Sequence, residues 1–187
     1  MSGLEMKNIR GRLGPLTPKI QIAVATAAAN WVMPIFASRW PESQGTALNA
    51  LNYCWLLADE KANPSELNDW SERVGALVPD SEADPEAGAA IPAGEAILAV
   101  LSMANEPNQK NTAEAIEAAY TAVEMQEYLL GEASGRLGGS KTAADVIKDL
   151  QAAQRASNPQ GFMAYMDRVL SAAASGGVLA VRQTAIH

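Results

Sequence analysis

The chain has very few of the side chains that usually carry out chemistry. Among its 187 residues there is one cysteine, Cys54, and one histidine, His187. A single cysteine forms no intramolecular disulfide, and the two residues together are too few for a zinc site built from thiolates and imidazoles. One histidine also excludes most catalytic triads. We therefore predict that the protein is not an enzyme and that it uses no metal and no cofactor.

Positive charge is also scarce. Acidic residues outnumber basic residues by 21 to 14, which gives a net charge of −7. A negative chain without a basic stripe repels phosphate backbones, so we expect no nucleic-acid partner. An acidic surface attracts basic proteins instead, and the composition therefore favours a protein partner.

A long, uninterrupted hydrophobic run is the third absence. Residues 20–36 are largely apolar and follow several basic residues, as in a secretory signal, but Gln21, Thr26, Asn30 and Pro34 interrupt them. No run of 18 residues is both uncharged and strongly apolar throughout, so we expect no membrane span and a cytoplasmic protein.

Alanine, the strongest helix former, is the commonest residue. The alternation of β-branched and aromatic residues that is typical of strands is nearly absent. We therefore predict an all-α fold, a single-domain bundle of about seven helices around a buried central helix. A capping residue precedes a proline at Thr17, Asn63 and Asn158, and each pair marks the start of a helix.

The spacing of hydrophobic residues by three and four positions locates these helices. The helix at residues 93–104 has Ser102 as its only polar residue after position 95, and we expect it to be the buried central helix. Pro34 removes a hydrogen-bond donor inside the first helix and predicts a kink or an early end there. The predicted helices are residues 18–37, 46–60, 64–77, 93–104, 112–130, 142–156 and 159–174.

We predict that residues 1–187 form one domain. Within it, residues 1–16 are a peripheral N-terminal segment. Residues 178–187 are a C-terminal tail, which Gly176 and Gly177 separate from the last helix.

An acidic loop is the leading candidate for a binding site. Residues 79–92 are predicted to be exposed between two helices and contain four carboxylates without a cation: Asp80, Glu82, Asp84 and Glu86. The segment lacks the glycine and the distal glutamate of an EF-hand loop, so a solvated loop is favoured over a calcium site. Because exposed carboxylates steer basic partners without contributing much to folding, we expect these four residues to contact the partner.

A pocket near Trp31, Asn52, Trp55 and Glu95 is the second candidate. Glu95 lies in the first turn of the most apolar helix, and its neighbours predict partial burial. A structural role, with the carboxylate held by backbone N–H groups, is favoured over a ligand-binding or catalytic role. Asn52 lies inside an apolar helix, where an amide usually makes a hydrogen bond to a neighbouring helix.

Four short strings occur in an order that resembles two related groups of proteins. The first is the YjaG-like all-helical bacterial family of unknown function, and the second is a set of helical immunity proteins encoded beside polymorphic toxins. The resemblance covers roughly residues 17–130. The strings are Val32-Met33-Pro34-Ile35-Phe36, Trp40-Pro41-Glu42, Leu51-Asn52 with Trp55, and Pro92-Ala93-Gly94-Glu95-Ala96.

The resemblance implies a function but also shows a departure. The YjaG-like pattern has an aspartate where this chain has Glu95 and an acid where it has Asn52, so the acidic pair of that family is incomplete here. The immunity-type resemblance implies a non-catalytic protein that binds and neutralises a cognate toxin, and an acidic surface would suit a basic toxin. A small-molecule-binding helical module and an oligomeric scaffold stay open as alternatives.

Overall fold

The computed structural model describes residues 3–78, 87–136 and 158–186. These residues form an all-α bundle without strands, which confirms the predicted fold class. Short 3-10 turns, η1 (Pro41–Ser43) and η2 (Pro64–Glu66), precede two of the helices. The α-helices of the described residues are α1 (Gly3–Leu13), α2 (Pro18–Arg39), α3 (Gln44–Ala58), α4 (Leu67–Gly75), α5 (Ala90–Asn105), α6 (Gln109–Arg136) and α8 (Pro159–Ile186).

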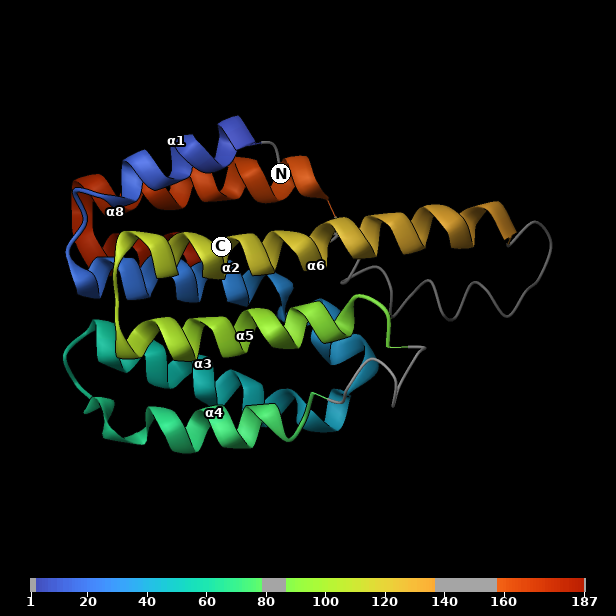
Figure 1. Cartoon of the computed structure of the whole chain (residues 1–187), viewed down its shortest axis with the longest axis horizontal. Helices are drawn as coiled ribbons and strands as arrows, with labels where there is room; N and C mark the ends of the chain where they lie inside the picture. Colours follow the sequence, from blue (N-terminus) through green and yellow to red (C-terminus); the bar gives the residue numbers. More distant parts are fainter. Residues whose placement is uncertain (1–2, 79–86, 137–157, 187) are drawn as a thin grey trace.

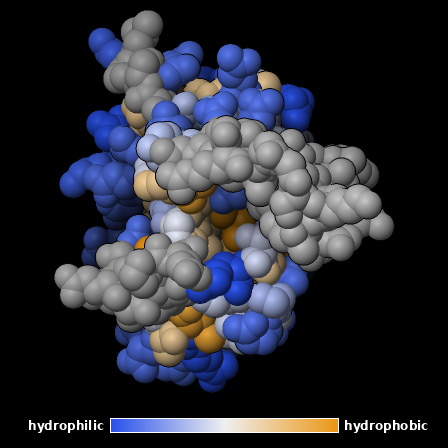
Figure 2. Space-filling view, turned by 90° about the vertical axis from the view of Figure 1, so that its right-hand side faces the viewer, coloured by the Kyte–Doolittle hydropathy of each residue, from blue (hydrophilic) through white to orange (hydrophobic). Residues whose placement is uncertain are grey.

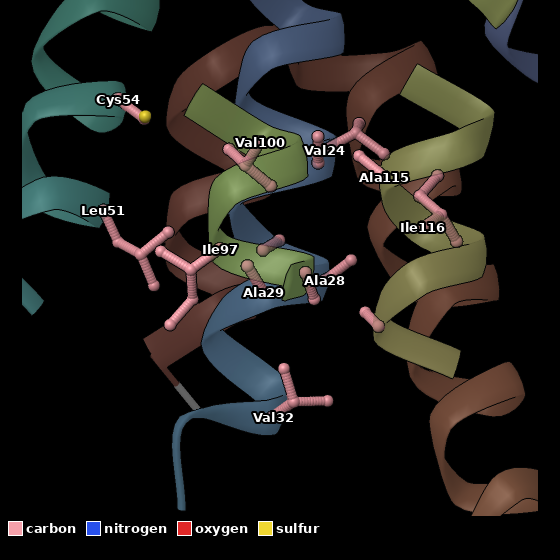
Figure 3. Close-up of a cluster of buried hydrophobic side chains, with 14 of the residues drawn as sticks. Val24, Ala28, Ala29, Val32, Leu51, Cys54, Ile97, Val100, Ala115 and Ile116 are labelled. Atoms are coloured by element: carbon pink, nitrogen blue, oxygen red, sulfur yellow. The ribbon is translucent and has the colours of Figure 1, made fainter. Parts of the chain in front are cut away.

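Two helices, α2 and α5, lie at the centre of the bundle (Figure 1). α2 packs against α3, α5, α6 and α8, and α5 packs against α2, α3, α4 and α6. Every α2 residue from position 21 to 29 is buried, and five of these nine are alanines, whose small side chains let neighbouring helices approach closely. In Figure 3, Ala28 and Ala29 of α2 lie beside the ribbon of α5.

The predicted central helix, α5, occupies the place expected for it. Ile97, Val100 and Leu101 are fully buried. One narrow side of α5 nevertheless reaches solvent, because Glu95 and Ser102 are exposed. The most completely buried run of the described residues is therefore in α2, and the two helices share the centre.

α2 is also long and apolar enough to cross a membrane when judged by length and composition alone. Its most apolar 18-residue window has a mean hydropathy of 1.5, and 72% of that window is buried inside the fold. The core helix of a helical bundle meets the same criterion, and the packing of α2 on four neighbouring helices is that of a core helix.

The N-terminal segment, to which the sequence assigned no helix, forms α1 and packs against α6. Met6, Ile9 and Leu13 are spaced by three and four positions and are buried. Gln21 holds the end of this helix in place: its Nε2 donates to the carbonyl oxygens of Leu13, at 3.2 Å, and Leu16, at 3.1 Å. Leu13 is the last residue of α1, where carbonyls lack an intrahelical partner, and Leu16 lies in the turn that follows.

α8 runs antiparallel to α2. The Tyr165 hydroxyl donates to the carbonyl oxygen of Ala27 at 3.1 Å, and further along the two helices Gly177 lies next to Ile20. Gly177 has φ 67° and ψ −153°, a conformation outside the helical region that glycine adopts without steric cost. α8 therefore consists of two helical pieces, and the predicted C-terminal tail is helical from residue 178 to residue 186.

The predicted helix starts are largely found. Asn63 accepts a hydrogen bond from the N–H of Ser65, and Asn158 accepts one from the N–H of Gly161, both at 3.0 Å. Thr17 precedes α2, as expected, but its side chain makes no capping bond. Of the two outcomes expected at Pro34, a kink or an early end, the early end does not occur, because α2 continues through the proline to residue 39.

Candidate functional site

The acidic loop predicted to contact a partner lies outside the described residues. Asp80, Glu82, Asp84 and Glu86 fall within residues 79–86, and their role stays a prediction.

The structure places the two tryptophans of the predicted pocket in different surroundings. The Trp31 ring lies 4.6 Å from the ring of Tyr165 and 6.2 Å from that of Phe162, near the start of α8. Trp55, on α3, is buried, and the guanidinium carbon of Arg182 lies 5.8 Å from its ring centroid, in the last part of α8. The two tryptophans therefore face opposite ends of α8.

The other two residues of the predicted pocket, Asn52 and Glu95, are exposed. The partial burial expected for Glu95 is wrong, because α5 leaves the side that carries Glu95 and Ser102 open to solvent. The described residues thus do not combine the four side chains into one enclosed site.

Aliphatic side chains fill the contact between α3 and α5 instead. Leu51 and Cys54 of α3 point toward Ile97 and Val100 of α5, and all four are buried (Figure 3). Burial raises the pKa of the Cys54 thiol to about 12, so the thiol is protonated at neutral pH. A buried, protonated thiol is a poor nucleophile and a poor metal ligand.

A charged cluster joins α3 to the end of the chain. The Arg182 guanidinium donates to the Asp59 carboxylate at 2.9 Å while it lies over Trp55, and Lys61 lies 3.4 Å from the same carboxylate. Each charged group here has an opposite charge beside it, which is the arrangement of a structural contact. The cluster fixes the last helical piece of α8 against α3.

Exposed residues follow one side of α6 over several turns. Glu117, Thr121, Glu124 and Tyr128 follow one another at steps of four, three and four residues, so they share one side of the helix. We define the outer face of α6 as the six exposed residues along this side: Glu114, Glu117, Thr121, Glu124, Met125 and Tyr128. The opposite side, with Ala119 and Val123, is buried in the bundle.

Carboxylates crowd the border between this face and α1. Burial raises the pKa of Tyr120 to about 12, and the negative charges of Glu124, Glu5 and Glu127 add to this shift. Glu124 also accepts a hydrogen bond from the Tyr120 phenol, and this bond favours the protonated form of Tyr120. Three carboxylates from two helices therefore act on one phenol, and the local field is negative.

The far part of α6 extends beyond the other helices (Figure 1). Glu127 lies seven residues after the buried Tyr120, on the same side of the helix, yet it is exposed. Met125 and Tyr128 are 42% and 61% exposed. Figure 2 looks onto this end of the molecule, where hydrophobic residues are visible in the middle of the view and hydrophilic residues surround them.

Among the described residues, no group of three or more histidine, cysteine, aspartate or glutamate side chains is arranged to hold a metal ion. Comparisons with family models, with curated proteins and with solved structures each found no match for this chain.

The sequence does not by itself distinguish Met125 and Tyr128 as a binding surface. The signal was present in the pattern, since both lie on the side of the predicted helix that carries Glu117 and Glu124. What the sequence alone did not reveal is that α6 extends beyond its neighbours, because this depends on the lengths of the helices packed beside it.

Proposed function

We propose that this protein is a non-catalytic binding protein that neutralises a basic partner, in the manner of the immunity proteins that its sequence resembles. The observation that carries the proposal is the outer face of α6, where Glu114, Glu117 and Glu124 are exposed on one side of a helix whose other side belongs to the core. Glu114 lies 3.7 Å from Lys110, one turn earlier on the same helix.

The physical basis of the proposal is electrostatic steering. Exposed carboxylates act over about 8 Å at physiological ionic strength, so a negative face raises the rate at which a basic partner arrives. Neutralisation needs no chemistry by the binding protein, because a bound partner is prevented from reaching its own substrate. This fits a chain whose one described thiol is buried and protonated.

The test begins with capture from the source organism on the immobilised full chain, followed by mass spectrometry. Each captured protein is then expressed alone and together with this chain in a bacterial growth assay. We expect one captured basic protein to stop growth alone and to be harmless when the chain is present.

A matched pair of charge variants completes the test. Glu114→Gln with Glu117→Gln should weaken protection, whereas Glu42→Gln with Glu72→Gln, an equal change of charge on η1 and α4, should leave it intact. The proposal is wrong if no captured protein inhibits growth, or if the chain does not relieve the inhibition.

A further inference from the structure

The end of α6 presents two large apolar side chains to solvent in a strongly acidic setting. Met125 and Tyr128 lie three residues apart, one helical turn, and are 42% and 61% exposed. Glu124 precedes Met125, and Glu127 precedes Tyr128. Tyrosine and methionine are enriched in protein interfaces, where they bury much area and adapt to the partner's shape.

We propose that this part of the outer face, centred on Met125 and Tyr128, is the docking site for a basic amphipathic helix of the partner protein. The inference rests on the proposed function and adds where the partner binds and which kind of segment it offers. An apolar ridge on the partner packs on Met125 and Tyr128, and lysine or arginine side chains beside that ridge pair with Glu117 and Glu124.

Charge decides between this occupant and a second copy of the chain. Two copies joined through this face would bring Glu117, Glu124 and Glu127 of one chain toward the same residues of the other. Like charges at that distance disfavour association, and the net charge of −7 adds to the repulsion. A basic segment turns the same carboxylates into favourable contacts.

The geometry of the face sets the size of the partner segment. The exposed residues run from position 114 to position 128, which at the rise of an α-helix is about 21 Å. A partner helix of about 15 residues covers that length. A single helix on a single face buries less than the roughly 1,200–2,000 Å² of a typical stable interface. We therefore expect this contact alone to be weak, with a dissociation constant of about a micromolar, and to weaken further as the salt concentration rises.

The experiment uses the full chain and a labelled 18-residue synthetic peptide of leucine, lysine and alanine, with leucines along one side and lysines beside them. A peptide of the same composition in scrambled order is the control for charge alone. Fluorescence anisotropy gives the dissociation constant of each peptide at low and at physiological salt. We expect the amphipathic peptide to bind at least tenfold more tightly than the scrambled peptide.

Variants then locate the binding. Met125→Ser with Tyr128→Ser should weaken binding of the amphipathic peptide at least tenfold. Leu48→Ser with Leu179→Ser removes two apolar side chains that are 38% and 66% exposed on other helices and should change the dissociation constant less than twofold. Thermal melting establishes that both variants are folded.

Three results would overturn the inference: equal binding of the two peptides, unchanged binding by the Met125 and Tyr128 variant, or equal weakening by both variant pairs. These results differ from failure of the proposed function. A captured toxin that is neutralised equally well by the Met125 and Tyr128 variant refutes the docking site and leaves the function standing. Peptide binding at this site without any toxic partner leaves the site standing and refutes the function.

Discussion

Replacing Gln21 by leucine tests how α1 is attached to the bundle. Gln21 is 5% exposed, and its Nε2 donates to the carbonyl oxygens of Leu13 and Leu16, at the end of α1 and in the turn that follows. Its Oε1 lies 3.3 Å from the hydroxyl of Thr112, which also donates to the carbonyl of Asn108 at 2.7 Å. Leucine has a similar volume, so the substitution removes hydrogen bonds and leaves little cavity.

The expected loss follows from the two carbonyls. Leu13 keeps a bond from the N–H of Leu16 at 3.0 Å, so losing the Gln21 bond costs about 0.5–1.5 kcal/mol there. The Leu16 carbonyl loses its side-chain donor in a partly buried place, which costs about 1–3 kcal/mol. The free energy of unfolding should therefore fall by about 2–4 kcal/mol, which for a chain of this length lowers Tm by about 4–16 °C.

Urea unfolding followed by circular dichroism measures the effect, and hydrogen exchange of the α1 amides shows whether α1 loosens first. Gln183→Leu is the control, because Gln183 is exposed on α8 and the same change there should stay within about 0.5 kcal/mol. A loss below about 1 kcal/mol for Gln21→Leu, or unchanged protection of α1, would refute the reasoning.

Three further predictions concern the core and one helix end. Leu101→Ala empties a fully buried position of α5 and should lower the free energy of unfolding in urea by about 2–5 kcal/mol; a loss below about 1 kcal/mol would contradict its central place. The pKa of Cys54 is raised from 9.0 to about 12, so the stability that its protonated thiol contributes is complete below pH 9 and is lost as the pH rises toward 12. Urea titrations between pH 8 and pH 11 cover about the range in which an unfolded thiol ionises. Over this range the free energy of unfolding should decline less steeply with pH for Cys54→Ala than for the unsubstituted protein, and an equally steep decline would count against burial of the thiol. Glu60 has φ 59° at the end of α3, where the N–H of Lys61 donates to the Leu56 carbonyl, so Glu60→Gly should raise the free energy of unfolding by about 0.5–1 kcal/mol, and a decrease in the same urea assay would argue against this strain.

Local signals in the sequence located most helices correctly. Asn63 and Asn158 act through their immediate neighbours, so the bonds that they make are visible in the chain itself. The sequence predicts that α6 starts at residue 112, three residues after its observed start at Gln109, because either of two asparagines could cap the helix. Asn108, and not Asn111, accepts the capping bond, which comes from the N–H of Asn111 at 2.9 Å.

Features that depend on distant partners were not predicted. The apolar residues of α1 are few, and their burial requires α6, which lies about a hundred residues later. The sequence predicts that α6 ends at residue 130, before Gly131, whereas the helix continues to residue 136. Glu95 was judged by its neighbours along the chain, although its exposure depends on which sides of α5 are covered by other helices.

For the candidate site, sequence identified the kind of surface better than its place. Acidic charge is a property of composition, and it is visible without a fold. The position of Met125 and Tyr128 relative to that charge depends on where α6 leaves the bundle, which only the packing of the neighbouring helices determines. The same holds for the predicted pocket, because packing places its two tryptophans in different surroundings and leaves Asn52 and Glu95 exposed.

The pairing of the first and last helices has a consequence for how the chain folds during synthesis. Arg12 of α1 lies 2.6 Å from the Asp167 carboxylate and donates to the Ser171 hydroxyl at 3.0 Å, and α8 also covers one side of α2. α2 ends at residue 39, and α8 begins at residue 159. At 5–20 residues per second, a ribosome needs about 6–24 s to make the intervening chain. During that time the side of α2 that packs on α8 is uncovered, so the nascent chain exposes apolar core surface until α8 has been made.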